Sequence, residues 1–357
     1  MIYQQKNMAD PTRRQLIHDC DPGQDDAIAL MSLLASSKWE VVGVTAVGGN
    51  VKVEQCARNA RKILALCGRE NVPVYEGALK PLRRKLITLE SVFGQSGMAG
   101  GDDLVDPCPK SKNGHAVDYL VDTLSQAERP FLICATAPLT NIALALQKNP
   151  AIADAIEQLV IMGGCVFPEP IRGEMGNIEV EGTHGKAEYN FAMDPEAAHI
   201  VFAAGIRNIA LIGLNVTRKV LFNSRWEKEF RNQSNKVAHK AADILSVVGS
   251  DDHIDYRHLR ASPNDPVRAV HDVVAAIYLD RPELFKTRRM HIKIVTGEPP
   301  EIAGQSLPAE STEIGASSFP VDVVIDCDPE EVFAALARNL SAYDNLSPSP
   351  HNFPFPP

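Results

Sequence analysis

Short runs of β-forming residues alternate with helical stretches along this chain of 357 residues. Alternation of this kind is typical of a parallel sheet that is covered by helices on both faces. We therefore expect an α/β fold, with a single large domain built on a mostly parallel, open, Rossmann-like sheet. The predicted strands cover residues 15–18, 41–46, 72–75, 131–135, 159–162, 208–213, 290–295 and 321–325.

An acidic turn follows the first predicted strand. Residues 19–26 read DCDPGQDD and lead into the apolar stretch 27–31. Four carboxylates this close repel one another unless some are protonated or a cation lies among them. Helix caps and turn chemistry account for one or two acidic residues, but not for four, and the spacing of an EF-hand loop is absent. A hard cation such as Ca²⁺, with about six to eight oxygen ligands, would relieve the repulsion. We interpret the turn as a catalytic metal site.

The other predicted strands also end in polar or glycine-rich loops. In open α/β sheets, ligands bind beyond the carboxyl ends of the strands, so we expect these loops to converge on the acidic turn. They are Gly48-Gly49-Asn50, Thr136-Ala137-Pro138, Gly163-Gly164 and Asn215-Val216-Thr217.

Composition narrows the classes of partner. The formal net charge is −9, and the sequence pI is about 5.6. Nucleic acids and anionic membranes require a basic face, so we expect neither as a partner. The seven cysteines form no C-x-x-C pair, and the first residues lack the apolar region of a secretory signal. We therefore expect a cytoplasmic protein with reduced thiols.

Three segments stand outside the main pattern. We expect residues 1–14 to be an N-terminal extension, residues 15–340 to be the main domain, and the proline-rich residues 341–357 to be a disordered tail. Within the domain, residues 80–114 are interpreted as a flap or insertion, and 167–185 as an unusually long connection. Residues 223–259 are polar with helical spacing and are interpreted as a mobile lid. His253 and Tyr256 in this segment are explained as surface residues or, alternatively, as lid contacts to the base.

Five sequence blocks, in this order, resemble the inosine–uridine nucleoside hydrolase family over about residues 15–340. The acidic turn matches the family's D-x-D-P-G-x-D-D-A element, and the later blocks are short. They are Gly48-Gly49-Asn50-Val51, Pro138-Leu139-Thr140-Asn141-Ile142-Ala143, Ala187-Glu188-Tyr189-Asn190 with Asp194-Pro195-Glu196-Ala197-Ala198, and His271-Asp272.

The resemblance implies Ca²⁺-dependent hydrolysis of the N-glycosidic bond of ribonucleosides, by a homodimer or homotetramer. In the family pattern, Asp21 is both a metal ligand and the general base, and His271 assists the leaving base. The remaining metal ligands are Asp26, the main-chain carbonyl of Thr136, and Asp272. The ribose contacts are Asp25, Asn50, Glu188 and Asn190. Phe93 stands where many members have histidine, so the resemblance does not transfer a preference for one base.

Other interpretations of the same residues stay open. Asp19-Cys20-Asp21 also resembles the nucleophile loop of Mg²⁺-dependent haloacid-dehalogenase-like phosphatases. A nucleoside- or ribose-binding protein without turnover is a third possibility. Locally, Asn50 is equally well explained as a turn residue. The alternative for Glu188 and Asn190 is that they are polar loop residues, and for His271 that it is a helix residue without a catalytic role. Asp19 is interpreted as a hydrogen-bond partner that supports the acidic turn.

Overall fold

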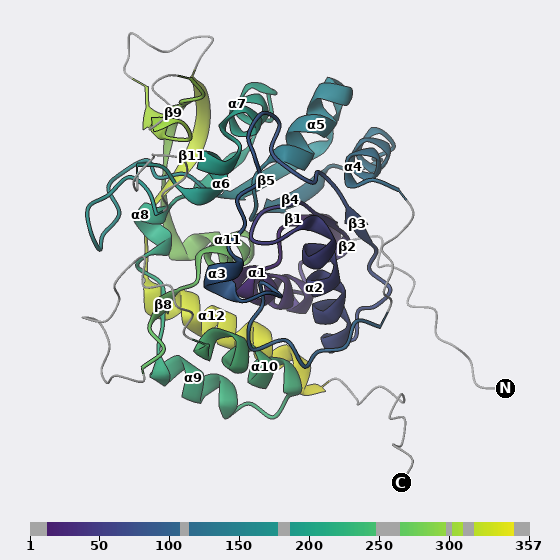
Figure 1. Cartoon of the computed structure of the whole chain (residues 1–357), viewed down its shortest axis with the longest axis vertical. Helices are drawn as coiled ribbons and strands as arrows, with labels where there is room; N and C mark the ends of the chain where they lie inside the picture. Colours follow the sequence, from purple (N-terminus) through teal and green to yellow (C-terminus); the bar gives the residue numbers. More distant parts are fainter. Residues whose placement is uncertain are drawn as a thin grey trace, which may run out of the picture.

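The computed structural model describes residues 13–107, 114–177, 186–247, 265–297, 302–309 and 318–345 (Figure 1). Most of the predicted N-terminal extension and proline-rich tail, and both His253 and Tyr256, lie outside these residues. No helix in the described part of the chain is long and apolar enough to cross a membrane. Six cysteines are described as free thiols, and five of them are buried.

One large sheet organises the described residues, and its strand order is β10-β9-β11-β6-β5-β4-β1-β2-β3. All pairings from β11 to β3 are parallel, whereas β9 is antiparallel to both β10 and β11. The prediction of a mostly parallel sheet is confirmed. The strands are β1 (Arg14–Cys20), β2 (Trp39–Ala46), β3 (Val74–Glu76), β4 (Phe131–Ala135), β5 (Ile156–Met162), β6 (Ile209–Ile212), β9 (Phe285–Ile294), β10 (Ser306–Pro308) and β11 (Phe319–Cys327).

Several predicted strand bounds were too short. β1 continues two residues beyond the expected end, and β9 begins five residues earlier than expected. The sequence also missed β10, whose three residues gain their strand geometry only by pairing with β9. A short ribbon of β7 (Leu221–Phe222) and β8 (Arg268–Ala269) forms a separate antiparallel pair.

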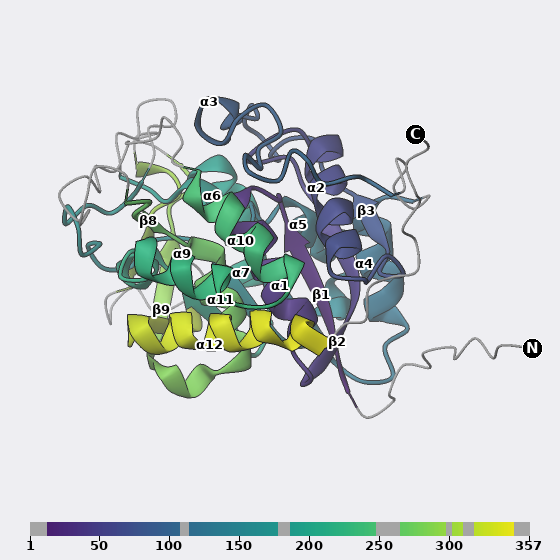
Figure 2. The same cartoon turned by 90° about the horizontal axis from the view of Figure 1, so that it is seen from below.

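Helices cover both faces of the large sheet (Figures 1 and 2). Two hydrophobic cores lie on opposite faces of the sheet, so both faces need a cover of helices. In β4, for example, Leu132 belongs to one core and its neighbour Ile133 to the other. A parallel strand buried on both faces reads as a continuous apolar run. The first core is covered by α1 (Gln24–Ala35), α2 (Val53–Leu66), α8 (Leu214–Thr217), α9 (Ser224–Arg231), α10 (Lys236–Ser246), α11 (His271–Asp280) and α12 (Pro329–Ser341). The second is covered by α4 (Ala116–Ser125), α5 (Thr140–Lys148) and α7 (Pro195–Ala203). The described residues also form the short helices α3 (Glu90–Phe93) and α6 (Tyr189–Met193), and 3₁₀ turns at Pro150–Ala155, Pro282–Leu284 and Ala342–Asn345.

The expectation that residues 223–247 are helical is confirmed, but the expectation that they form a lid is wrong. Here α9 and α10 are amphipathic helices whose apolar sides belong to the core: Phe230 and Ile244 are fully buried. The ring of Trp226 stacks on Phe333 of α12, with centroids 5.0 Å apart. The sequence looked polar because the opposite sides of both helices carry charge. The remainder of the expected lid, from residue 248, lies outside the described residues.

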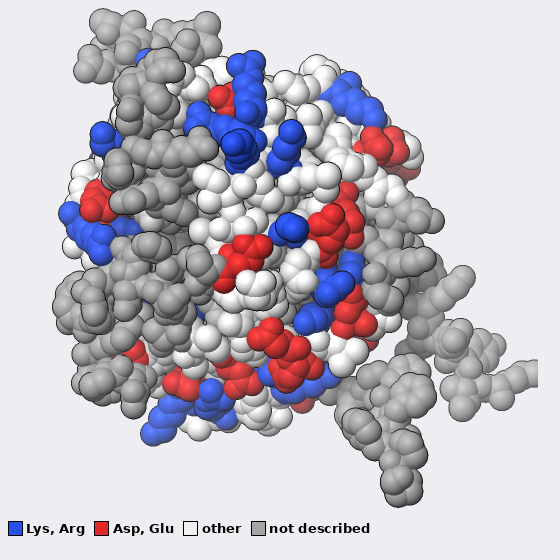
Figure 3. All heavy atoms as spheres, in the orientation of Figure 1, with Lys and Arg blue, Asp and Glu red and all other residues white. Residues whose placement is uncertain are grey.

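Basic and acidic side chains are interspersed on the face of the molecule in Figure 3. The net charge of −9 is therefore not gathered into one acidic patch on that face.

Candidate active site

The loops after β1, β2, β4 and β5 meet at one edge of the sheet. The chain builds β1, β2 and β3 outward in one direction, and then places β4 on the other side of β1. This reversal is the topological switch point, where open α/β sheets bind their ligands. The prediction that the polar loops converge is confirmed by the hydrogen bonds between them.

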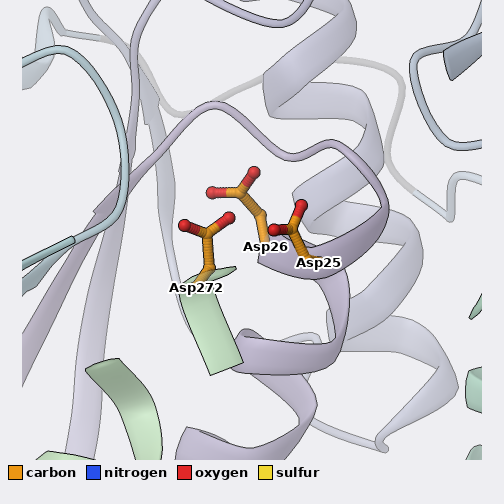
Figure 4. Close-up of side chains that lie close together, drawn as sticks. All are labelled: Asp25, Asp26 and Asp272. Atoms are coloured by element: carbon orange, nitrogen blue, oxygen red, sulfur yellow. The ribbon is translucent and has the colours of Figure 1, made fainter. Parts of the chain in front are cut away.

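Three carboxylates from opposite ends of the chain lie together at this point (Figure 4). Oxygen atoms of Asp25, Asp26 and Asp272 all lie within 4.8 Å of one another. Asp25 and Asp26 belong to the first turn of α1, and Asp272 belongs to the first turn of α11, which packs against α1. The partial positive charge at two helix N-termini favours anions there.

Asp21 lies beside this cluster and is held by the loop after β2. Its Oδ2 accepts a hydrogen bond of 2.6 Å from the backbone N–H of Asn50. A Cβ at Gly49 would lie 2.0 Å from the same oxygen, so only glycine permits this approach. The other oxygen, Oδ1, is buried and has no hydrogen-bond partner within the described residues.

Both oxygens of Asp26 are held by neighbouring loops. Oδ1 accepts from the Thr136 hydroxyl at 2.8 Å. Oδ2 accepts from the Gly23 N–H at 3.1 Å and from Asn50 Nδ2 at 3.2 Å. The side chain of Asn50 also donates to the Asp21 carbonyl at 3.1 Å. Asn50 therefore does more than form a turn, because it ties two acidic residues to the loop after β2.

Burial and mutual repulsion raise the pKa values of the acidic residues. Desolvation is the larger cause for all three affected carboxyls, followed by the charges of neighbouring carboxylates. The pKa values of Asp21 and Asp272 rise well above their ordinary range, and that of Asp26 rises to about 7. A cation among these oxygens would remove the cause of the repulsion. The unpartnered Asp21 Oδ1 and the all-oxygen donor set fit a hard divalent ion.

The residues expected to contact the sugar lie around the same cluster. Glu188 caps α6: Oε1 accepts from Asn190 N at 2.9 Å, and Oε2 accepts from Phe191 N at 3.1 Å and Gly164 N at 2.8 Å. Burial raises the pKa of Glu188 to about 7. Asn190 Nδ2 donates to the carbonyl oxygens of Thr136 and Met162, both at 3.2 Å.

His271 begins α11 directly before Asp272. Its backbone N–H donates to Asp25 Oδ2 at 3.1 Å, and its Nδ1 lies 2.7 Å from Thr217 Oγ1. Burial lowers the pKa of His271 to about 4, so the imidazole is neutral at pH 7. Asp25, which the sequence interpretation assigned to the sugar rather than to the metal, thus belongs to the tight carboxylate group and also contacts the backbone of α11.

A second layer of polar residues supports the acidic turn, and the sequence interpretation missed most of it. Asp19 was expected to be such a support, and its Oδ1 accepts from Thr45 Oγ1 at 2.6 Å and Asn141 Nδ2 at 2.9 Å. Asn59 Nδ2 donates to the carbonyls of Pro22 and Ser96, at 2.8 and 2.7 Å. The signal that could have revealed this layer is a polar residue inside an otherwise apolar strand or helix face.

The fold and the site together define an α/β enzyme with a carboxylate-rich active site at the switch point of its sheet. The family model described as inosine-uridine preferring nucleoside hydrolase matches residues 16–334. An uncharacterised protein of Schizosaccharomyces pombe is 36% identical over 327 residues, which cover 91% of this chain and 98% of that protein. The pyrimidine-specific ribonucleoside hydrolase RihA of Salmonella paratyphi A is 36% identical over 281 residues, covering 79% of this chain and 84% of RihA.

Solved structures agree with these matches. The chain is similar to a purine-preferring ribonucleoside hydrolase from Gardnerella vaginalis, with 27% identity, a TM-score of 0.78, and coverage of 94% of this chain and 100% of that one. It is also similar to a plant nucleoside hydrolase, with 26% identity, a TM-score of 0.77, and coverage of 92% and 99%. This chain belongs to the inosine-uridine preferring nucleoside hydrolase family and is a ribonucleoside hydrolase. The phosphatase and the binding protein without turnover, considered from the sequence, are thereby set aside.

Proposed function

We propose that this enzyme hydrolyses the N-glycosidic bond of ribonucleosides in a calcium-dependent reaction, releasing free base and ribose for nucleoside salvage or catabolism. The observation that carries the proposal is the cluster of Asp25, Asp26 and Asp272, with Asp21 beside it, at the switch point of the sheet. Residues 15–340 would form the single catalytic domain. The cytoplasmic location and the homodimeric or homotetrameric state stay predictions from the sequence.

The protein ligands of the ion would be the carboxylates of Asp21, Asp26 and Asp272 and the main-chain carbonyl of Thr136. Asp25 is close enough to share in neutralising the site. When bound, Ca²⁺ would lower the pKa of an attacking water and help to orient the sugar hydroxyls. Three carboxylate ligands and a carbonyl, with a fourth carboxylate nearby, favour Ca²⁺, which accepts many oxygen ligands in flexible geometry, over Mg²⁺.

Asp21 is the proposed general base. Its Oδ1 is buried and accepts no hydrogen bond from any described residue, while Oδ2 accepts one from the backbone N–H of Asn50. A carboxylate oriented in this way accepts the proton of the attacking water. Attack occurs on an anomeric carbon that carries oxocarbenium character in the transition state, so nearby negative charge is stabilising.

The sugar would be held by hydrogen-bond acceptors. The Nδ2 groups of Asn50 and Asn190 already donate to protein oxygens, so each residue offers its amide oxygen to a ribose hydroxyl. Asp25 and Glu188 add carboxylate oxygens. A deoxyribose lacks a hydroxyl and would leave an acceptor of the pocket without its hydrogen bond, so the pocket should discriminate against deoxyribonucleosides. His271 would lie on the side of the departing base.

An assay of ribose release tests this function. Inosine, uridine and a phosphomonoester are incubated with the purified enzyme, with and without a chelator, because one named relative is purine-preferring and another is pyrimidine-specific. We expect release of ribose from a nucleoside, no release of phosphate, and loss of activity in chelator that returns with Ca²⁺. The Asp21→Ala variant serves as the control and should lose at least about 10²-fold in kcat, because it removes the proposed base.

Two results would contradict the proposal. Ribose release that is unaffected by chelator would exclude the divalent ion. Near-normal kcat in a folded Asp21→Ala variant would exclude Asp21 as the base.

A further inference from the structure

A buried histidine of β1 is connected to the acidic cluster through one hydroxyl group. His18 is a polar residue but is fully buried, like its apolar strand neighbours Leu16 and Ile17. His18 Nε2 lies 3.1 Å from Thr136 Oγ1, and Thr136 Oγ1 lies 2.8 Å from Asp26 Oδ1. The pairing of β1 with β4 holds this geometry, since the Thr136 N–H donates to the carbonyl of Asp19 at 2.9 Å.

The direction of the two hydrogen bonds follows from the number of protons. A threonine hydroxyl donates once, and an ionised carboxylate, the form that binds a cation, only accepts, so Thr136 donates to Asp26. Thr136 Oγ1 must then accept from His18, which places the imidazole proton on Nε2. Burial lowers the pKa of His18 to about 3, which agrees with a neutral ring. The two hydrogen bonds therefore run in one direction, from His18 to Thr136 and from Thr136 to Asp26.

Packing alone does not explain a histidine at this position. Its Nδ1 is buried without a hydrogen-bond partner among the described residues, which costs free energy that an apolar side chain would avoid. The residue it contacts, Thr136, also supplies the main-chain carbonyl proposed as a metal ligand, and that carbonyl accepts from Asn190. One side chain is therefore linked to two of the proposed ligands.

We propose that His18 is a positioning residue, which acts through the Thr136 hydroxyl to orient the Asp26 carboxylate and the loop after β4 for cation binding. The inference rests on the proposed calcium-dependent function. Hydrogen-bond partners behind the ligands of a metal site contribute about 10- to 100-fold to metal affinity or activity.

Three substitutions of one side chain test the inference. His18→Leu removes the donor. His18→Gln places an amide N–H near the position of Nε2, whereas His18→Asn places it one methylene short of Thr136. Ile17→Val is the matched control, since it removes one buried methyl group from the same strand without a link to Asp26. Calcium affinity is measured by titration calorimetry on chelator-stripped protein, with urea unfolding alongside and kcat measured at saturating calcium.

We expect His18→Leu and His18→Asn to bind calcium about 10- to 100-fold more weakly than the wild type, and His18→Gln to recover most of the affinity. Ile17→Val should lose stability without losing calcium affinity. If His18→Leu does not fold, the comparison of the His18→Asn and His18→Gln variants is sufficient to test the inference. Equal calcium affinity in these two variants, or wild-type affinity in a folded His18→Leu variant, would contradict the role of His18 but not the proposed calcium-dependent function. A wild-type protein that binds no calcium would overturn the proposed cofactor and this inference with it.

Discussion

Individual polar residues of the site form hydrogen bonds to other protein groups as well as facing the proposed ligand. The amide groups of Asn50 and Asn190 are both spent on protein oxygens, and the Glu188 carboxylate accepts from three backbone N–H groups. Each residue therefore builds the loops as well as facing the proposed ligand. Substitutions here should change the position of neighbouring residues in addition to substrate contacts, because a buried donor or acceptor left without its partner costs more free energy than the bond itself.

The His271→Ala substitution should harm purine nucleosides more than pyrimidine nucleosides. With Thr217 as the donor to Nδ1, neutral His271 would carry its proton on Nε2, from which it could be donated to a purine N7, an acceptor that pyrimidines lack. We expect kcat on inosine to fall at least about 10²-fold and kcat on uridine to fall by about tenfold or less. Thr217→Val, measured in parallel, should show the same selectivity more weakly. Equal losses on both substrates would contradict this role.

At the scale of elements, a buried ion pair connects the long segment after β5 to the end of α8. Arg218 and Glu169 approach to 2.9 Å with no exposed side-chain surface on either residue. Glu169 also accepts from the backbone N–H groups of Ile171 and Arg172. Arg218 directly follows Thr217, the partner of His271, so the pair joins the long segment to the side of the site where His271 lies.

Breaking that pair on one side should destabilise the fold strongly. Glu169→Gln leaves the Arg218 charge buried without its counter-ion, and we expect a loss of about 3–5 kcal/mol in the free energy of unfolding. Asp118→Asn, which breaks the exposed pair of Asp118 with Lys148, should cost less than about 1 kcal/mol. Urea denaturation of both variants gives the comparison. Similar small losses in the two variants would show that the buried pair has little structural role.

At the scale of the whole molecule, folding buries several carboxyl groups at the active site, and this burial disfavours their ionised forms. Asp21, Asp26, Asp272 and Glu188 have pKa values raised by burial, so the folded metal-free protein holds protons that the unfolded chain has released. By linkage, groups of this kind lower stability as the pH rises through their folded-state pKa values. His18 and His271 act in the opposite sense, but only below about pH 6.5, where the unfolded chain gains their protons.

The metal-free enzyme should therefore lose stability between pH 6.5 and 8. Asp26 and Glu188, each with a pKa of about 7, titrate in this window. Each carboxyl lowers the free energy of unfolding by up to about 1.4 kcal/mol per pH unit below its folded-state pKa, and by progressively less above it. We expect the melting temperature in chelator to fall across this range, and calcium to reduce or remove the fall because a cation stabilises the ionised carboxylates. A melting temperature in chelator that rises with pH from 6.5 to 8 would contradict the sign.

Local patterns in the sequence were sufficient for the sheet and for the outline of the site. The interior strands are apolar on both faces, so runs such as 131–135 were recognisable without neighbours. The acidic turn was recognisable because four carboxylates exceed what capping requires. Edge elements were harder: β10 depends on β9 for its hydrogen bonds, and α9 and α10 bury one side of polar-looking segments.

The sequence by itself determined the fold class, the family and the residues of the acidic turn, since these depend on short-range patterns and on motifs in order. The family resemblance grouped Asp272 with Asp21 and Asp26, but only the tertiary structure showed that Asp25 lies in the same group. Asp272 reaches Asp25 and Asp26 because α11 packs on α1, and His18 reaches Asp26 only through a threonine on another strand. Contacts between residues more than a hundred positions apart follow from strand order and helix packing, which no local pattern encodes.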